Sequence, residues 1–352
     1  MPQQLQGQQR LAYIDTAKGL GMLFVIFAHV NYTPQLLVAI YSFHMPLYFI
    51  LSGMLFRRER YDSFPQFLKR RFQTLLIPYL ILSLLSVAYG YWSEHLFPEL
   101  FSISGKKYLS YFLHIFTAPR SGLLINTPLW FVTCLFVVES IYFLLSGRKK
   151  WQVAVICFVL ACTGWLLESG LLPFNNKLLP WSLDSGLFAL SFYAFGNLFR
   201  DRICSAADKL DTHPRKIPMC LGLLLLLLVL WYPPMIANGK VTLGSKILNN
   251  GFLFFLTGIL GTFAILLVSL LLKKSRFLTF CGQNSFYLMS THYMIRKFTL
   301  PKFYALLGIR LYDKTSLRET ILPFILVLLL SLCTALVIRW IRAKWRSRHP
   351  LS

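Results

Sequence analysis

Three ionisable side chains stand within the first long apolar stretch of the chain. Asp15, Lys18 and His29 lie among Leu, Phe, Val and Ile in residues 12–31. Lys18 and His29 are eleven residues apart, about three helical turns, so on one helix they share a face and lie roughly 16 Å apart along the axis. Because ionisable groups are costly in a membrane, we expect them to face a helix bundle or a wet cavity.

A second histidine stands on the next apolar stretch, in "FHMPLYFILSGMLF". The connection around residues 31–35 is tight and contains Pro34, so the two stretches are expected to pack as an antiparallel hairpin. His29 and His44 would then meet in the outer half of the membrane. A histidine can take a proton from a hydroxyl near neutral pH, and a polar partner can fix its tautomer. Paired histidines inside a membrane can alternatively relay protons in a transporter.

Basic residues gather between the second and third apolar stretches. Arg57, Arg70 and Arg71 belong to this group, and Arg71 stands seven residues before Pro78. Guanidinium groups bind phosphate in a bidentate geometry, so Arg71 and Lys18 together would suit a polyphosphate ligand at the inner opening of one cavity. The alternative is that the cluster only fixes topology or meets anionic lipid.

Membrane helices must position these groups. The chain has 352 residues, of which 56% are hydrophobic and 14% charged, which predicts an all-α polytopic membrane protein with a single domain over residues 1–352. The first stretch lacks a cleavage site and is expected to remain in the protein. Ten spans are predicted, at residues 12–33, 36–56, 72–93, 128–146, 151–169, 182–199, 217–235, 248–272, 278–295 and 320–341.

The distribution of Lys and Arg predicts the orientation. Most of the 36 basic residues fall in alternate connections, which places the head (residues 1–11) and the basic tail (residues 342–352) in the cytoplasm. We expect a multi-pass protein of a cell membrane, the bacterial cytoplasmic membrane, that contacts lipid. A net charge of +23 would suggest nucleic acid for a soluble protein, but here it follows from topology and no nucleic-acid partner is expected.

Two predicted outer segments are long enough to have structure of their own. Residues 94–127 would suit a helix at the membrane surface, and residues 296–318 mix aromatic with basic side chains. Each segment is either an interfacial anchor or a platform for an anionic or carbohydrate acceptor. The seven cysteines include no CxxC pair, so neither a disulfide nor a metal site is expected.

An ordered set of segments carries a resemblance to a known family. The segments are "RLAYIDTAKGLGMLFVIFAHV", "FHMPLYFILSGMLF", "KRRFQTLLIPYL", "PLWFVTCLF", "WSLDSGLFALSFYAFGNLFR" and "NSFYLMSTHYMI". Together they cover essentially the whole chain, which resembles acyltransferase family 3 and is most similar to the branch of fucose 4-O-acetylase and related acetyltransferases. The resemblance implies an enzyme that transfers an acyl group, by prevalence acetyl, from cytoplasmic acetyl-CoA to a hydroxyl of an extracytoplasmic glycan or lipid-linked saccharide. Acyl-CoA would be a donor substrate, with no permanently bound cofactor.

The resemblance also implies roles for individual residues. The family's intramembrane histidine maps to His29, and its basic residue eleven positions earlier, usually Arg, maps to Lys18. The arginine before the proline of the third span maps to Arg71, and His44 matches the FHMP element. His29 would act as general base or transient acyl acceptor, His44 would orient it or serve the acceptor hydroxyl, and the basic residues would hold the phosphates. A lysine lacks the guanidinium fork, so bidentate binding is not expected at Lys18.

Supporting positions are less specific. Asp15 could pair with Lys18 or Arg71, and Ser52 precedes Gly53 at a point of close helix approach. Simple structural interpretations exist for Trp130 as an interfacial anchor, for His292 as a structural hydrogen bond, and for Glu139 and Asp184 as packing partners or helix-end charges. The main alternative function is a transporter or flippase of a lipid-linked sugar. A structural component of polysaccharide export is a further alternative.

Overall fold

The protein is all-helical in the part of the chain that the computed structural model describes. Outside its helices, these residues form a single β-bridge, between Thr242 and Ile247. The all-α polytopic class is therefore confirmed. The structure describes residues 2–30, 33–100, 105–118, 123, 125–169, 179–243, 245, 247–306 and 317–348.

Eight helical segments among the described residues are long and apolar enough to cross a membrane. They are Ala12–Val30, Pro34–Leu55, Phe64–Leu96, Thr127–Leu145, Lys150–Glu168, Lys216–Asn238, Gly251–Leu271 and Ile321–Ile341. The other two predicted spans have a different form. Residues 182–199 give α9 (Leu183–Leu198), whose 16 residues span only about 24 Å. Residues 278–295 are divided at Asn284 into α13 (Arg276–Gln283) and α14 (Ser285–Met294).

The spans divide into an inner and an outer group by burial. The inner spans have 56–61% of their residues buried and the outer spans 11–28%. The inner group comprises α1 (Pro2–Val30), α2 (Pro34–Tyr41) with α3 (His44–Leu55), α7 (Trp130–Leu145) and α12 (Gly251–Leu271). The outer group comprises α4 (Phe64–Arg71) with α5 (Ile77–Leu96), α8 (Lys150–Glu168), α11 (Lys216–Asn238) and α16 (Leu317–Arg348). More than half of each inner span is thus shielded by the other helices.

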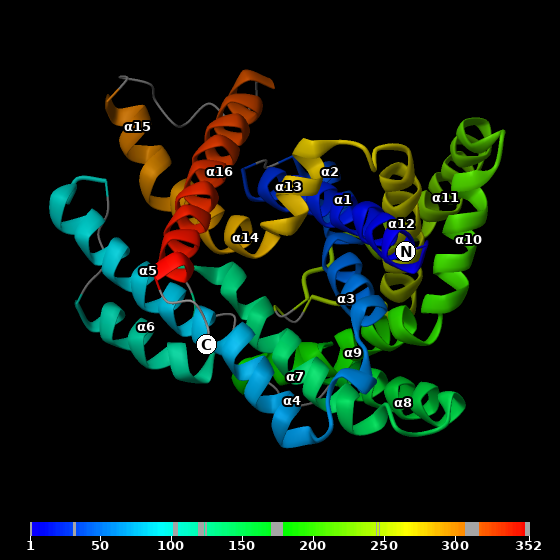
Figure 1. Ribbon diagram of the computed structural model, residues 1–352. Helices are drawn as coiled ribbons and strands as arrows, with labels where there is room; N and C mark the ends of the chain where they lie inside the picture. Colours follow the sequence, from blue (N-terminus) through cyan, green and yellow to red (C-terminus); the bar gives the residue numbers. More distant parts are fainter. Residues whose placement is uncertain are drawn as a thin grey trace.

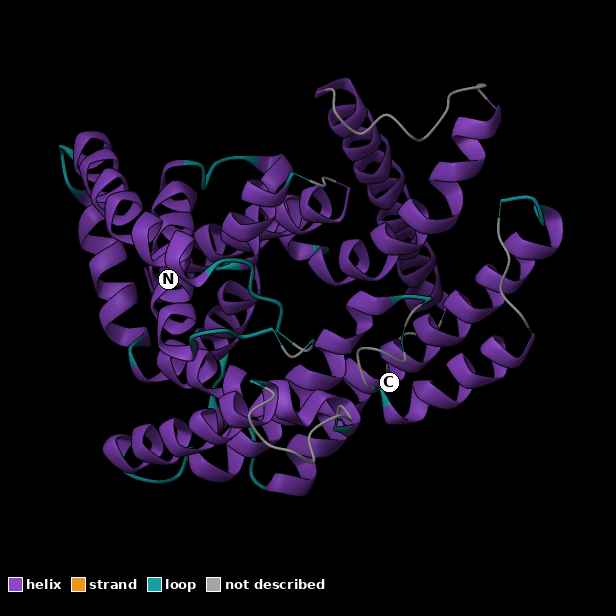
Figure 2. Ribbon diagram, turned by 180° about the vertical axis from the view of Figure 1, so that it is seen from behind, coloured by secondary structure: helices purple, strands orange, loops and turns teal. Residues whose placement is uncertain are grey.

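The arrangement is visible in two opposite views. Helices α5, α15 (Leu300–Leu306), α16 and α6 (Gly105–Thr117) gather on one side, and α11, α12 and α10 (Arg200–Thr212) on the other (Figure 1). The view from behind shows the same bundle, with helices throughout and no strand drawn among the described residues (Figure 2). Helix α1 packs against α13, α12, α14 and α3, and α3 packs against α9. The N-terminal helix is therefore at the centre of the bundle.

Pro46 explains why the second span is divided. A proline ring inside a helix clashes with the carbonyl four residues earlier, here that of Ser42, and supplies no N–H to it. Helix α2 ends at Tyr41, Phe43 has non-helical angles (φ −135°, ψ −22°), and α3 begins at His44. The break places His44 in the first turn of a new helix.

Two π-helical turns also precede prolines. Phe72–Leu76 ends two residues before Pro78, and Ile295–Thr299 ends two residues before Pro301. Each proline leaves the carbonyl four residues earlier without its usual donor, which favours local rearrangement of the helix. The first turn follows Arg71 directly, and the second follows the helix that carries His292.

Glycines allow α3 and α9 to approach closely, as predicted for the Ser52-Gly53 pair. A Cβ atom at Gly53 would lie 2.0 Å from the carbonyl oxygen of Tyr193, and one at Gly196 would lie 2.1 Å from that of Ile50. Because both obstacles are backbone atoms, a side chain at either position would force the two helices apart.

Replacing Gly53 by Ala should therefore lower the free energy of unfolding by about 1–3 kcal/mol or more, the usual cost of overpacking. The check is thermal unfolding of the purified protein in detergent micelles. Gly222→Ala in α11 is the matched control, because no described atom lies within 4 Å of a Cβ there. The control should be neutral or stabilising by up to about 1 kcal/mol. Equal melting temperatures for Gly53→Ala and the native protein would contradict the packing argument.

Asp211 connects two helices and the segment after α12, outside the membrane-spanning segments. Its carboxylate accepts a hydrogen bond of 2.6 Å from Nζ of Lys216 and another from Nζ of Lys273. Partial burial would raise the pKa of Asp211, but the two ammonium groups outweigh burial and hold the pKa below its ordinary value. At neutral pH the carboxylate is therefore charged and links the end of α10 to α11 and to the segment after α12.

Candidate functional site

A cavity of about 210 Å³ lies among the inner helices. Its walls come from α1, α2, α3, α7, α12 and α14, and from the connections that precede α7 and α12. Five of the residues predicted from sequence line it: Lys18, His29, His44, Ser52 and Trp130. The first two spans thus bring Lys18, His29 and His44 to one cavity, although the three residues come from two separate helices.

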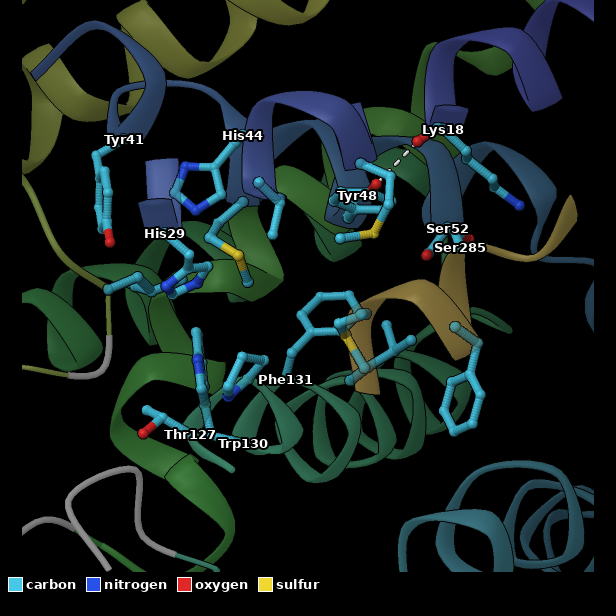
Figure 3. Close-up of a pocket in the computed structure, with 18 of the residues that line it drawn as sticks. Lys18, His29, Tyr41, His44, Tyr48, Ser52, Thr127, Trp130, Phe131 and Ser285 are labelled. Atoms are coloured by element: carbon cyan, nitrogen blue, oxygen red, sulfur yellow. Dashed lines mark hydrogen bonds between the residues drawn. The ribbon is translucent and has the colours of Figure 1, made fainter. Parts of the chain in front are cut away.

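The cavity has two polar ends and an apolar middle. His29, His44 and Tyr41 lie at one end, and Lys18 lies with Ser52 and Ser285 at the other (Figure 3). Phe131 lies between them (Figure 3), and the other apolar residues of the wall include Met22, Met45, Leu135, Phe286 and Met289. The cavity can therefore hold an elongated ligand that carries negative charge at one end and a group that loses a proton at the other.

His44 is held in a defined tautomer. Its Nδ1 lies 2.9 Å from the carbonyl oxygen of Ile40. A carbonyl only accepts, so Nδ1 carries a proton and Nε2 of the neutral ring carries the lone pair. The ring of Tyr41 contacts the His44 ring edge-on, with centroids 4.8 Å apart. The end of α2 therefore positions the first residue of α3.

Tyr48 completes a polar stripe that sequence reasoning missed. His44, Tyr48 and Ser52 follow one another at intervals of four residues, so they share one face of α3. The hydroxyl of Tyr48 donates a hydrogen bond of 2.8 Å to the backbone carbonyl of Lys18 (Figure 3). The four-residue spacing was a signal that could have identified Tyr48 as a cavity residue.

Asp15 lies near Lys18 but is bonded elsewhere. The two residues are three positions apart on α1 and hence neighbours on its surface. The Asp15 carboxylate accepts a hydrogen bond of 3.2 Å from the side-chain amide of Gln283. This bond links α1 to α13 beside the Lys18 end of the cavity. The ion pair of Arg71 is formed with another acidic residue.

The acidic partner of Arg71 is Glu139 in α7. Nε of Arg71 lies 2.8 Å from Oε2 of Glu139, whose residue is 3% exposed. Arg57 donates long hydrogen bonds to the carbonyls of Met54 and Phe56, and Arg70 is exposed. Among the described residues that line the cavity, none of the three arginines is present. The three arginines are therefore not part of the described cavity wall, and Glu139 is the packing partner expected from its position.

Trp130 is more buried than expected, whereas His292 forms the structural hydrogen bond that was expected. Trp130 is 3% exposed and lines the cavity, so the interpretation as an interfacial anchor is wrong. Trp130 is the first residue of α7 and directly follows the 3-10 turn Thr127–Leu129. His292 is fully buried, donates from Nδ1 to the carbonyl of Leu288 over 2.9 Å, and has its ring centroid 5.0 Å from that of His29.

Asp184 is a helix-end charge, as expected. It stands in the first turn of α9 and accepts hydrogen bonds from the backbone N–H groups of Ser185 and Leu179. Trp181 and Ser182 precede it with positive φ angles of 58° and 54°. The turn and its acidic residue therefore define where this short helix begins.

The connection between α11 and α12 was not predicted to form part of the site. Thr242 and Leu243 line the cavity, and Nζ of Lys240 lies 5.7 Å from the centroid of the Tyr41 ring. No periodic pattern in this connection identified it. The predicted outer segments 94–127 and 296–318 include residues 101–104, 119–122, 124 and 307–316, which lie outside the described residues, as do residues 31 and 32 of the first turn.

A comparison with protein families agrees with this geometry. The family model described as an acyltransferase domain matches residues 11–340. No curated protein and no solved structure shows significant similarity to the chain. The family match extends from α1 to α16 and includes every residue of the cavity wall. The chain therefore belongs to acyltransferase family 3 and is a multi-pass membrane acyltransferase.

Proposed function

We propose that the protein is a membrane O-acyltransferase that moves an acetyl group from acyl-CoA on the cytoplasmic side to a hydroxyl of an extracytoplasmic or lipid-linked glycan. The observation that carries the proposal is the single cavity with Lys18 at one end and His29 with His44 at the other. The eleven-residue step from Lys18 to His29 corresponds to roughly 16 Å of helix. An acyl-CoA has this polarity: phosphates at one end and a thioester at the end of a long arm.

The reaction follows from the chemistry of the two ends. Lys18 attracts the phosphates of the donor as a point charge, and Arg71 offers the terminal nitrogens of its guanidinium while Nε contacts Glu139. His29 takes the proton of the acceptor hydroxyl as its oxygen attacks the thioester carbonyl. The new C–O bond forms, the C–S bond breaks, and the thiolate leaves with a proton returned from His29. His44 orients the hydroxyl through its Nε2.

The test is mass spectrometry of the surface glycans of the host cell, with the gene intact, deleted, or restored with a His29→Ala variant. We expect an ester-linked acetyl group to disappear in the last two strains while glycan export continues. The sugar that loses the ester identifies the acceptor. If the glycan itself stops reaching the surface and its acylation pattern is unchanged, the proposal is wrong and transport of a lipid-linked sugar becomes the better explanation.

Lys18 can be tested separately from the histidines. Lys18→Met should raise the KM for acetyl-CoA by about 10-fold or more, the equivalent of one charge-assisted hydrogen bond, and leave kcat close to the native value. Lys18→Arg should retain most of the affinity because it keeps the charge. The assay uses membrane vesicles with the cytoplasmic face outward and radiolabelled acetyl-CoA. Lys69→Met is the control, because Lys69 is exposed on α4 and is not among the described residues of the cavity wall. An unchanged KM in Lys18→Met would exclude the phosphate role.

A further inference from the structure

His292 presents a lone pair inside the protein. It stands on α14 just before the π-helical turn Ile295–Thr299 and has no exposed surface. Its Nδ1 donates to the carbonyl of Leu288 over 2.9 Å, so Nε2 is the unprotonated nitrogen of the neutral ring. Nε2 is buried and has no hydrogen-bond partner among the described residues. A buried acceptor without a donor is unfavourable and calls for an explanation.

The nearest imidazole is that of His29. The centroids of the two rings are 5.0 Å apart and their planes are tilted by 47°. An N–H···N hydrogen bond of about 3 Å between two imidazoles places their centroids roughly 5 Å apart, so the separation already fits such a bond. His29 lines the cavity and is half-buried, whereas His292 is enclosed and is absent from the described cavity wall. The bond requires a rotation of the His29 ring that turns one of its nitrogens toward Nε2 of His292.

On the basis of the proposed function, we propose that His292 is a positioning residue whose Nε2 accepts a hydrogen bond from an N–H group of His29. This bond turns the other nitrogen of His29, with its lone pair, toward the acceptor hydroxyl. The arrangement follows the general rule that a catalytic base is itself oriented by a third group. The arrangement also gives different roles to the two histidines near His29, which are His44 and His292. His44 lines the cavity and can contact substrate, while His292 lies behind His29.

The same contact stabilises His29 during the reaction. When His29 takes the proton of the hydroxyl it becomes an imidazolium, and the lone pair of His292 then faces a stronger donor. No carboxylate contacts His292 among the described residues, and the nearby cation Arg296 lies over the Tyr293 ring at 5.9 Å. A neutral partner of this kind is expected to contribute less than the aspartate of a catalytic triad.

Two amide substitutions separate the proposal from a structural role. Glutamine places its amide near the Nε2 position of histidine, and asparagine places it near the Nδ1 position. His292→Asn can keep the bond to Leu288 but cannot reach His29, whereas His292→Gln can present its oxygen to His29. We expect His292→Asn to lower kcat by about 10- to 100-fold with an unchanged KM for acetyl-CoA. We expect His292→Gln to remain within about fivefold of the native kcat.

The measurement uses vesicles with the cytoplasmic face outward from the host strain that lacks the gene, radiolabelled acetyl-CoA, and rates normalised to folded protein. In the His29→Ala background, His292→Asn should cause no additional loss, because His292 acts through His29. Equal kcat values for the Asn and Gln variants, or an Asn variant within twofold of the native kcat, would overturn the proposal. Both results presuppose that His29→Ala is inactive; if His29→Ala is as active as the native protein, the proposed function fails rather than this inference alone.

Discussion

Replacing His29 by Ala should lower acyl transfer by about 100- to 10,000-fold, because the reaction loses its general base. The variant should accumulate normally and bind acetyl-CoA with an unchanged KM, since Lys18 lies at the far end of the cavity. Transfer is measured with radiolabelled acetyl-CoA in vesicles with the cytoplasmic face outward, per unit of folded protein. His29 lines a cavity and is only partly buried, so truncation should not collapse the helix core.

The control for this substitution is another histidine. His213→Ala changes an exposed residue between α10 and α11 that is not part of the described cavity wall. Transfer by this variant should match the native rate. A His29→Ala variant that retains a tenth or more of the native rate would remove His29 from the chemical step and leave it as a structural residue.

The second large effect concerns the ion pair between Arg71 and Glu139. Glu139→Ala removes the partner of Arg71, whose side chain is 24% exposed. Removing one member of a buried pair leaves the other charge uncompensated and typically lowers stability by about 3–5 kcal/mol. We expect a value near the lower limit, because Arg71 retains some contact with solvent. Thermal unfolding in detergent micelles measures the effect, and Glu59→Ala, at an exposed site in the preceding connection, is the control.

A double substitution separates the two possible roles of Arg71. Replacing Arg71 and Glu139 together by Met should restore most of the lost stability, because apolar residues of similar size often substitute well for a buried pair. If Arg71 also binds the phosphates of the donor, the stable double variant should have a raised KM for acetyl-CoA. An unchanged KM would mean that the charge pair is structural and that Lys18 alone attracts the donor. A double variant as unstable as Glu139→Ala would contradict the ion-pair argument itself.

Local sequence patterns identified part of the site. The eleven-residue interval between Lys18 and His29 predicts a shared helix face, and the short turn around Pro34 brings His44 to the same region. Tyr48 could have been added by the same reasoning, because it continues the face of His44 at a four-residue interval. The roles of these residues in catalysis remain predictions that the experiments above test.

Contacts between distant segments could not be predicted in this way. His29 on α1 contacts His292 on α14, and Arg71 at the end of α4 forms an ion pair with Glu139 in α7. Helical periodicity indicates which face of a helix is polar, but it does not indicate which other helix that face will meet. The burial of Trp130 shows the same limit, since an aromatic residue at a helix start suits both an interface and a cavity wall.

Composition and periodicity by themselves determined that this chain is a polytopic helical membrane protein, where eight of its ten predicted spans lie, and that Lys18, His29 and His44 face inward. These properties depend on the cost of placing polar groups in lipid, which acts on each segment separately. Only the tertiary structure decided that Lys18 and His29 stand at opposite ends of one cavity, that Arg71 pairs with Glu139, and that His292 lies behind His29. Those features depend on how helices pack, which is a property of the whole bundle.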